Sequence, residues 1–372
     1  MDFSLTEQQE EFRSYIRKVL SQDGVTRIAR ETAVGNESEL TKVHEKLAEL
    51  GVTGISIPEK YGGIELGEID LIPIMEEFGR AVMPDIYAET LAFVVPILLE
   101  QGNEQQKQEY LSAIASGDSL LAVAWCEPHG DYSYDSIGTT ATKTIDGYLL
   151  NGTKSLVRHT SQVTHFLLLA KDSSGDLCLF IVPKDKVTKI EEQKSFDATQ
   201  PFGLLSLENV EVTSECRLAV NDIEEVLERA MLKLIVALNS TMIGSMDRLV
   251  EMSTEYAKIR EQFGQPIGRF QAIKHRLADL KVTLETARAL SHYATWTVQH
   301  KSNDLIETVY SAKALLVDSY IKIAAESVQI HGGIGFTEEL DCHLYVKRSR
   351  VYENYFGSPY DVRERAAIAM GW

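Results

Sequence analysis

The chain has 372 residues, 44% of them hydrophobic, and its 37 lysines and arginines are outnumbered by 55 aspartates and glutamates, for a formal net charge of −18. This length and composition exclude a disordered chain and a minimal scaffold, and they suit two or three domains with a sizeable core. The acidic balance repels nucleic-acid backbones and anionic bilayers, so we expect neither as a partner. A ligand that carries phosphates would have to be held by a few local cations or helix ends.

The cysteine spacing and the N-terminal residues indicate the cellular compartment of the protein. The four cysteines lie far apart and lack a C-x-x-C pair, which argues against a zinc site and a disulfide framework and predicts reduced thiols: Cys126, Cys178, Cys216 and Cys342. The first residues show no basic stretch followed by an apolar run, and no segment reaches the ~18 apolar residues of a membrane span. We therefore expect a cytoplasmic protein without a membrane span and without a metal site.

The first 118 residues are predicted to be helical. Thr6 and Gln9 have the spacing of a capping box, and apolar residues then recur at helical intervals. Four further amphipathic segments are predicted at 42–50, 71–82, 89–100 and 104–114. The stretch 51–63 contains Pro58 and a glycine pair, which indicates a loop.

Short β-prone runs follow between residues 119 and 221, at 120–124, 139–145, 148–151, 165–171, 177–182 and 210–212. The dipeptide Asp146-Gly147 lies between two of these runs and is typical of a type I′ hairpin. After residue 222 the periodicity is helical again, in segments long enough for a bundle. These helices are predicted at 222–259, 270–300, 303–331, 339–352 and 360–369.

Two motif clusters lie in the C-terminal part. One spans 256–271 and contains Arg260-Glu261-Gln262-Phe263-Gly264, and the other is Gln329-Ile330-His331-Gly332-Gly333 with Gly335 two residues later. With the helical, β and helical order, they make the chain resemble the acyl-CoA dehydrogenase family over essentially its whole length. The resemblance implies an α+β multidomain fold. It has an N-terminal helical domain (1–118), a middle β-barrel or sandwich domain (119–221) and a C-terminal four-helix bundle (222–372) that drives oligomer formation.

The resemblance also implies a cofactor. In this family, the two motifs of one subunit hold the pyrophosphate and adenosine end of an FAD whose flavin ring lies in the neighbouring subunit. A guanidinium fork suits pyrophosphate, and glycines let the backbone approach a ligand closely. Read singly, the motifs would be a solvated helix end and a plain helix C-cap, but their joint occurrence favours the cofactor site. The cofactor contacts implied for this chain are Arg260, Gln262, Phe263, Gln329, Gly332 and Gly333.

The catalytic carboxylate of the family is absent from both of its usual positions. That base removes the α-proton of the thioester while the flavin takes the β-hydride, so it must lie within hydrogen-bond reach of the α-carbon. Counted without gaps, the position used by most members is Phe356, and the position used by a minority is Leu234. Glu353 is the alternative base, and it would require a deletion in the register.

The β segment also lacks family residues, in this case those that face the subunit's own flavin. The first seven positions of the family pattern T-E-P-x-x-G-S-D correspond to residues 126–132, where Cys126 replaces the flavin-facing Thr and Tyr132 replaces the Ser. The pattern W-I-T-N corresponds to residues 156–159, which puts Arg158 where a small hydroxyl normally touches the flavin ring. We expect Arg158 to obstruct a flavin, unless its side chain lies on the surface and points away.

Features that serve a subunit's own flavin are thus degraded, whereas features that reach a neighbour's cofactor are kept. The hypothesis that follows is a non-catalytic subunit of an FAD-dependent acyl-CoA dehydrogenase, an α2β2 heterotetramer in which the partner subunit carries the catalytic Glu. Its reaction would be α,β-dehydrogenation of an acyl-CoA, with electron-transfer flavoprotein as the acceptor. Two alternatives stay open: a self-sufficient homo-oligomeric enzyme with Glu353 as the base, and a scaffold that binds no flavin.

The segment from His343 to Arg348 points to one group within the acyl-CoA dehydrogenase family. Its H-L-Y-x-K-R pattern is similar to that of bacterial acyl-CoA dehydrogenases of steroid and other bulky-ring catabolism, several of which are heterotetramers. The resemblance therefore implies lipid or steroid catabolism and a bulky acyl group.

Overall fold

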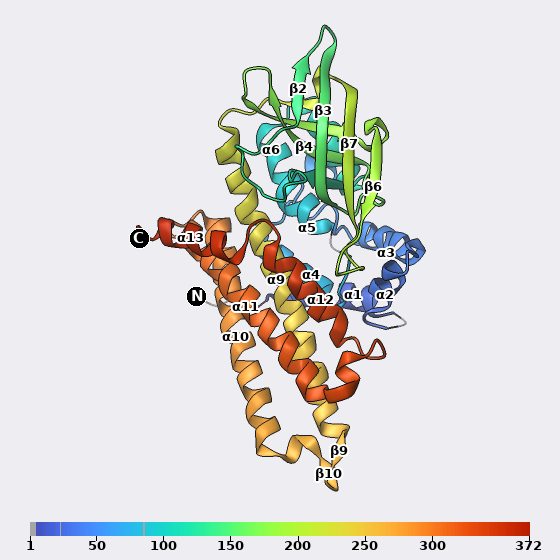
Figure 1. Cartoon of the computed structure of the whole chain (residues 1–372), viewed down its shortest axis with the longest axis vertical. Coiled ribbons are helices and arrows are strands. Elements are labelled where there is room, and N and C mark those ends of the chain that lie inside the picture. The colour runs from blue at the N-terminus through green and yellow to red at the C-terminus, as the bar shows by residue number, and fades with distance from the viewer. Residues whose placement is uncertain (1–4, 23, 85) are drawn as a thin grey trace. The chain divides into compact units, whose positions relative to one another are not determined.

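The computed structural model describes residues 5–22, 24–84 and 86–372 (Figure 1). By their internal contacts these residues form two compact units. The first unit combines Met1–Asn36, Glu68–Met83 and Ile235–Trp372, and the second combines Glu37–Gly67 and Pro84–Leu234. Each unit is described below by itself.

The first unit is helical, and its long helices follow the predicted pattern closely. Its helices are α1 (Glu7–Ser21), α2 (Arg27–Ala33), α4 (Glu68–Arg80), most of α9 (Ile223–Ile259), α10 (Gln271–His300), α11 (Leu305–His331), α12 (Cys342–Asn354) and α13 (Pro359–Ala369). Two short strands, β9 (Glu261–Gln262) and β10 (Gln265–Pro266), and the 3₁₀ turn η6 (Ile267–Arg269) join α9 to α10, and η7 (Gly332–Phe336) follows α11.

The start of α1 confirms the predicted capping box. The Thr6 hydroxyl accepts a hydrogen bond from the Gln9 N–H at 3.3 Å, and the Gln9 side chain accepts one from the Thr6 N–H at 2.9 Å. Two of the N–H groups that lack intrahelical partners are thereby satisfied. Helix α2 was not predicted, because it has only seven residues and no side chain caps its N-terminus.

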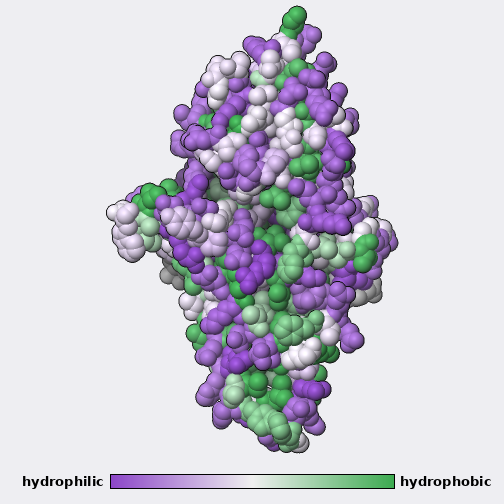
Figure 2. Space-filling model, in the orientation of Figure 1, coloured by the Kyte–Doolittle hydropathy of each residue, from purple (hydrophilic) through white to green (hydrophobic). Residues whose placement is uncertain are grey.

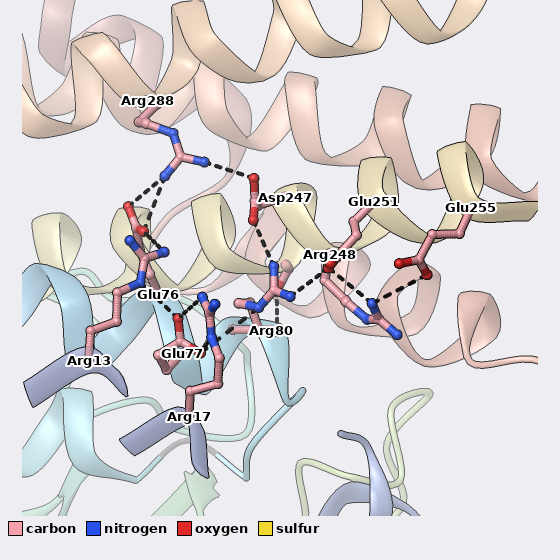
Figure 3. A network of polar contacts seen from close by, with 12 residues as sticks. Arg13, Arg17, Glu76, Glu77, Arg80, Asp247, Arg248, Glu251, Glu255 and Arg288 are labelled. Carbon is pink, nitrogen blue, oxygen red and sulfur yellow. Dashed lines mark hydrogen bonds and ion pairs between the residues drawn. The ribbon is translucent and has the colours of Figure 1, made fainter. Parts of the chain in front are cut away.

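Helices α4 and α9 pack backbone against backbone at two glycines. A Cβ on Gly244 would lie 1.7 Å from the carbonyl O of Glu76, and one on Gly79 would lie 1.9 Å from that of Thr241. The close crossing therefore tolerates no side chain at either position. It brings the acidic residues of α4 next to α9, where a network of arginines and carboxylates from α1, α4, α9 and α10 surrounds them (Figure 3).

The second unit holds the sheet and several short helical segments. The helical segments before the sheet are α3 (Ser38–Glu49), η1 (Glu59–Tyr61), α5 (Tyr87–Glu89), the π-helical η2 (Thr90–Val94), α6 (Val95–Gln101), α7 (Glu104–Gln106), the π-helical η3 (Lys107–Leu111) and α8 (Ser112–Ala115). The 3₁₀ turns η4 (Lys184–Lys186) and η5 (Ser214–Cys216) lie between strands, and the first part of α9 follows the last strand. The strands are β1 (Leu121–Ala124), β2 (Thr140–Lys143), β3 (Gly147–Arg158), β4 (His165–Asp172), β5 (Leu177–Pro183), β6 (Lys189–Gln193), β7 (Phe202–Thr213) and β8 (Arg217–Leu218).

These strands form one eight-stranded sheet in the order β6-β7-β3-β2-β4-β5-β8, with β1 paired to β4. Most neighbours are antiparallel, but β1 and β2 both run parallel to β4. Strands β4 and β5 carry the buried centre, where runs such as Phe166 to Ala170 are almost fully enclosed. Long continuous apolar runs of this kind are typical of strands covered on both faces.

The predicted hairpin at Asp146-Gly147 is confirmed as a connection, but its turn type is wrong. Strands β2 and β3 pair antiparallel, with Lys143 opposite Tyr148. Neither Asp146 nor Gly147 has the positive φ that a type I′ turn requires. The loop is instead closed by the Thr144 N–H, which donates to the Gly147 carbonyl at 2.9 Å.

Two further observations concern the whole chain. All four cysteines are free thiols, as their spacing predicted. Within the described residues, no helix combines the length and the apolar character needed to cross a membrane.

Candidate functional site

Three of the predicted cofactor residues lie on or beside the short hairpin after α9. Arg260 follows α9 directly, Gln262 ends β9, and Phe263 occupies the turn. Phe263 and Gly264 both have positive φ, at 53° and 78°, which is the geometry of a type I′ turn. Phe263 is 94% exposed, so the hairpin presents its tip to the surroundings.

The other three predicted cofactor residues lie where α11 ends. Gly332 caps the helix with φ 66° and donates its N–H to the carbonyls of Val328 and Gln329. A side chain would be strained at that φ. Gly333 has no such reason to be glycine, because its φ is not positive and a Cβ there would meet nothing within 4 Å. The side chain of Gln329 is exposed.

The two segments meet at the ends of their helices. The ring of Tyr256, in the last turn of α9, lies with its centroid 4.5 Å from that of His331, the last residue of α11. His331 is buried, and its Nδ1 lies 2.7 Å from the Ser327 carbonyl O. The fold therefore brings together the hairpin that follows α9 and the glycine turn that follows α11, which are far apart in sequence.

Two of the cations at this end of the unit lack counter-charges within the described residues. Residues 258–276 hold five lysines and arginines and one glutamate, although the whole chain carries −18. Of the seventeen arginines in the sequence, Arg260 and Arg269 are the two whose side chains have no hydrogen bond or ion pair within the described part of the chain. The C-terminus of α9, with partial negative charge, directly precedes Arg260, so an anion held at this residue would depend on the cations for its counter-charge.

Exposed apolar side chains accompany these cations. Ile259 is 77% exposed, Phe263 94% and Phe336 82%. Figure 2 shows apolar atoms at the end of the bundle where β9 and β10 lie. A ligand with an aromatic ring and a charged diphosphate would match both features.

Phe356 follows α12 and has a left-handed backbone conformation. It is buried, its φ is 53°, and its ring centroid lies 4.4 Å from that of Tyr355. Lys313 on α11 supports this segment from the interior: its Nζ donates to the carbonyl O of Tyr355 at 2.6 Å and to that of Phe356 at 3.1 Å. Sequence reasoning missed Lys313, although a lysine among apolar residues of a helix was the signal available.

Neither of the other candidate positions supplies a free carboxylate. Leu234 is fully buried within α9. Glu353, in the last turn of α12, lies with its Oε2 3.0 Å from Nη1 of Arg350, and its side chain is 27% exposed. A carboxylate paired with arginine on a helix surface is a common structural ion pair.

In the second unit, Arg158 is fully buried, so the alternative of a surface arginine pointing away is wrong. Its Nη2 donates to the Gln200 Oε1 at 2.6 Å, and its Nη1 lies 3.9 Å from the Glu89 Oε1. The ring of His159, whose φ is 47°, brings its Nε2 within 2.6 Å of the same Gln200 oxygen. The segment that corresponds to W-I-T-N is therefore filled by two bulky, buried polar side chains.

A buried ion pair holds the segment that corresponds to T-E-P. The Oε1 of Glu127 accepts hydrogen bonds from the Lys154 Nζ at 2.9 Å and from the Thr139 hydroxyl at 2.6 Å. Burial alone would raise the pKa of Glu127, but these hydrogen bonds outweigh it and hold the pKa at about 2. Burial lowers the pKa of Lys154 to about 8. Sequence reasoning did not find this pair.

Aromatic side chains cover the same segment. Tyr134 stacks on Trp125, with ring centroids 5.3 Å apart, and Tyr132 packs edge-on against Trp125 at 6.2 Å. Cys126 is buried beside them, and burial raises the pKa of its thiol to about 11. The loop after Glu127 is thus folded back onto Trp125, and Cys126 is a packed thiol rather than a reactive one.

Comparison with known proteins places these features in a family. The family described as "Acyl-CoA dehydrogenase, N-terminal domain" matches residues 6–118, and "Acyl-CoA dehydrogenase, C-terminal domain" matches residues 230–370. The chain is 30% identical to the caffeyl-CoA reductase-Etf complex subunit CarC of Acetobacterium woodii over 370 residues, which cover 95% of each chain.

Solved structures share the fold. Butyryl-CoA dehydrogenase from Megasphaera elsdenii superposes with a TM-score of 0.91 at 24% identity and covers 100% of both chains. An acyl-CoA dehydrogenase complexed with FAD from Bacillus anthracis gives a TM-score of 0.90 at 24% identity, covering 99% of this chain and 68% of that one. The helical, sheet and helical order expected from the sequence is confirmed. This chain belongs to the acyl-CoA dehydrogenase family of oxidoreductases.

Proposed function

We propose that this chain is a non-catalytic subunit of a heteromeric, FAD-dependent acyl-CoA dehydrogenase. Dehydrogenation needs a carboxylate that accepts the α-proton, while bound flavin supplies the acceptor for the β-hydride. The observation that carries the proposal is the buried phenyl ring of Phe356, at the position that the family resemblance gives to the base. A phenyl ring accepts no proton, and neither does Leu234 at the other position.

The end of the first unit would contribute to a cofactor site of the partner subunit. There Arg260, Gln262, Phe263, Gln329, Gly332 and Gly333 would hold the adenosine and diphosphate half of FAD. Two observations fit that role: the Arg260 side chain has no counter-anion within the described residues, and space lies open beside Gly333. The guanidinium would supply charge, and the glycine would let the backbone approach the ligand.

A flavin ring of the chain's own fits poorly. The resemblance places a small hydroxyl at position 158, but this chain has a buried guanidinium held by Gln200. Tyr132 stands where the family has a Ser, and it packs on Trp125. We therefore infer that the bulky side chains Arg158 and Tyr132 obstruct a flavin in this chain.

The partners follow from the same proposal. The first partner is a second acyl-CoA dehydrogenase subunit that carries the catalytic Glu, in an α2β2 heterotetramer. Electron-transfer flavoprotein is the proposed electron acceptor, and the relative CarC is named as part of a complex with Etf. The segment from His343 to Arg348 supports a steroid-derived or otherwise bulky acyl-CoA as the substrate.

The proposal is tested by purifying the chain alone and together with its partner. The chain alone should lack the visible absorbance of flavin and have no acyl-CoA dehydrogenase activity, whereas the co-expressed complex should be yellow and active. A flavinated, active homo-oligomer of this chain would overturn the proposal. An assembled complex without flavin absorbance would instead identify a flavin-free scaffold.

Arg260→Gln in the complex tests the residue assignment. Hydrogen bonds to charged groups contribute about 1.5–3 kcal/mol, which predicts a loss in FAD affinity of roughly 10- to 100-fold. Arg363→Gln is the matched control, because Arg363 is also on the surface but already pairs with Asp318 at 2.6 Å. This control should retain FAD fully, and equal losses in the two variants would contradict a specific role for Arg260.

A further inference from the structure

The proposed cofactor contacts come from two segments, each attached to the end of a different helix. Arg260 is fixed to α9 by its N–H, which donates to the Tyr256 carbonyl at 2.8 Å. Gly332 is fixed to α11 by its N–H, which donates to the carbonyls of Val328 and Gln329. A single diphosphate can contact both segments only if the distance between the C-terminal ends of α9 and α11 is fixed.

The rings of Tyr256 and His331 form the contact between these helix ends. Their centroids lie 4.5 Å apart with an interplanar angle of 37°. Tyr256 lies one helical turn before Arg260, and His331 directly precedes Gly332. The contact thus lies next to both proposed cofactor segments.

The imidazole of His331 is held firmly from its own side. It is 4% exposed, and its Nδ1 lies 2.7 Å from the Ser327 carbonyl O. The Sγ of Cys342 lies 3.6 Å from the same nitrogen. A ring enclosed in this way gives Tyr256 a fixed surface to pack against.

We propose that Tyr256 and His331 are positioning residues for the shared cofactor. Their ring contact sets the distance between Arg260 and the backbone at Gly332 and Gly333, so that both segments reach one diphosphate. This inference rests on the function proposed above. Binding groups must be held to within about 0.5 Å to keep their contribution, so a shift of the α9 end alone should weaken binding.

A double-mutant cycle on the purified heteromeric complex tests this coupling. The variants are Tyr256→Leu, Arg260→Gln and the two combined, and FAD affinity is measured by fluorescence during titration of the flavin-free complex. Tyr256→Leu should bind FAD roughly tenfold more weakly and Arg260→Gln roughly 10- to 100-fold more weakly. The combined variant should bind about as weakly as Arg260→Gln alone. Additive losses would overturn the proposal, because Tyr256 would then not act through Arg260.

Two further variants separate positioning from general stability. Tyr256→Phe keeps the ring and should keep the FAD affinity. Trp296→Leu removes the ring contact between Trp296 and His300, whose centroids are also 4.5 Å apart. This contact lies at the C-terminal end of α10, roughly 40 Å along the helix from Gln271, its first residue. This control should lower thermal stability and leave the FAD affinity unchanged, and a loss of affinity equal to that of Tyr256→Leu would contradict positioning.

If Tyr256→Leu prevents assembly, His331→Gln serves in its place. It removes the ring and keeps a side-chain donor for the Ser327 carbonyl, and the same non-additivity with Arg260→Gln is expected. The failures are distinguishable. Full FAD affinity in Arg260→Gln would refute the cofactor assignment itself, whereas a loss there with none in Tyr256→Leu or His331→Gln would refute only the positioning role.

Discussion

Lys313 donates hydrogen bonds to the backbone carbonyls of Tyr355 and Phe356. Its Nζ lies 2.6 Å from the carbonyl O of Tyr355 and 3.1 Å from that of Phe356, whose φ is 53°. Burial, and to a smaller extent the charge of Arg365, lowers the pKa of Lys313 to about 7. The segment at the expected base position is therefore firmly supported, although its side chain carries no acid–base chemistry.

The Lys313 amine should make stability depend on pH above neutrality. Its pKa falls from 10.5 to about 7 on folding, so between these values the unfolded chain binds more protons and stability rises with pH. Lys313→Met removes this contribution. Urea unfolding at several pH values from 7 upward should show the parent gaining free energy of unfolding relative to the variant. Parallel pH profiles would contradict a titrating buried amine.

Glu76 should be a major electrostatic anchor of the first unit (Figure 3). Its carboxylate is 1% exposed and accepts from Arg13 at 2.9 Å and from Arg288 at 3.1 Å. Burial raises its pKa, but the hydrogen bond with His292 and the charges of Arg288 and Arg13 outweigh burial and lower the pKa. Glu76→Gln removes the buried carboxylate that Arg13 and Arg288 share, while Arg13 keeps Glu77 and Arg288 keeps Asp247, and it should cost about 1.5–3 kcal/mol in urea unfolding at neutral pH.

Glu255 provides the control within the same network. Its side chain is 60% exposed and lies 3.9 Å from Arg248, so Glu255→Gln should cost at most about 0.5 kcal/mol. Because the pKa of Glu76 is lowered by folding, the parent's advantage over Glu76→Gln should be complete above pH 4.5 and should shrink as the pH falls below it. Similar costs for the two variants would refute the importance of burial.

Glu127→Gln tests the buried pair in the second unit. Folding lowers the pKa of Glu127 from 4.5 to about 2, so its stabilisation should be complete above pH 4.5 and fade toward pH 2. The variant also weakens the anchors at the Gly138 and Thr139 N–H groups, both 2.9 Å away. Unfolding free energies should show a deficit near neutrality that narrows in acid. Asp131→Asn, in the exposed part of the same loop, should lower the unfolding free energy near neutrality much less than Glu127→Gln.

Glu353→Gln distinguishes the heteromeric enzyme from a self-sufficient one. Because Glu353 pairs with Arg350 at 3.0 Å on the helix surface, replacing it should leave the activity of the complex essentially unchanged. The same change at the partner's catalytic Glu should abolish activity with flavin retained. Loss of activity in Glu353→Gln, again with flavin retained, would favour the homo-oligomeric alternative.

The sequence predicted the long elements well because their signals are local. The capping box at Thr6 and the apolar periodicity of α9 to α11 depend on residues within a few turns of one another. Strand β6 escaped prediction because Lys189–Gln193 is an edge strand of charged residues without apolar alternation. The domain boundaries at 118/119 and 221/222 stay a prediction, since contacts group residues 84–234 into one unit.

The candidate site was harder to predict where partners are distant in sequence. Motif spacing indicated Arg260 and Gly332, but the ring contact between Tyr256 and His331 depends on how α9 and α11 end. Lys154 and Glu127 are likewise paired through strand packing. Turn types also depended on context: the type I′ geometry predicted for Asp146-Gly147 occurs instead at Phe263-Gly264.

Gly333→Ala offers the most direct test of whether another molecule approaches this turn. A Cβ at Gly333 would meet nothing within 4 Å and its φ is not positive, so the stability of the chain should stay unchanged or rise by up to about 1 kcal/mol. A Cβ at Gly335 would lie 2.7 Å from the Val328 carbonyl O, so Gly335→Ala should lower stability. If the diphosphate of FAD lies close to the backbone at Gly333, Gly333→Ala should combine full stability of the chain with poor FAD retention in the complex. Full FAD retention in Gly333→Ala would show that its open space is plain solvent.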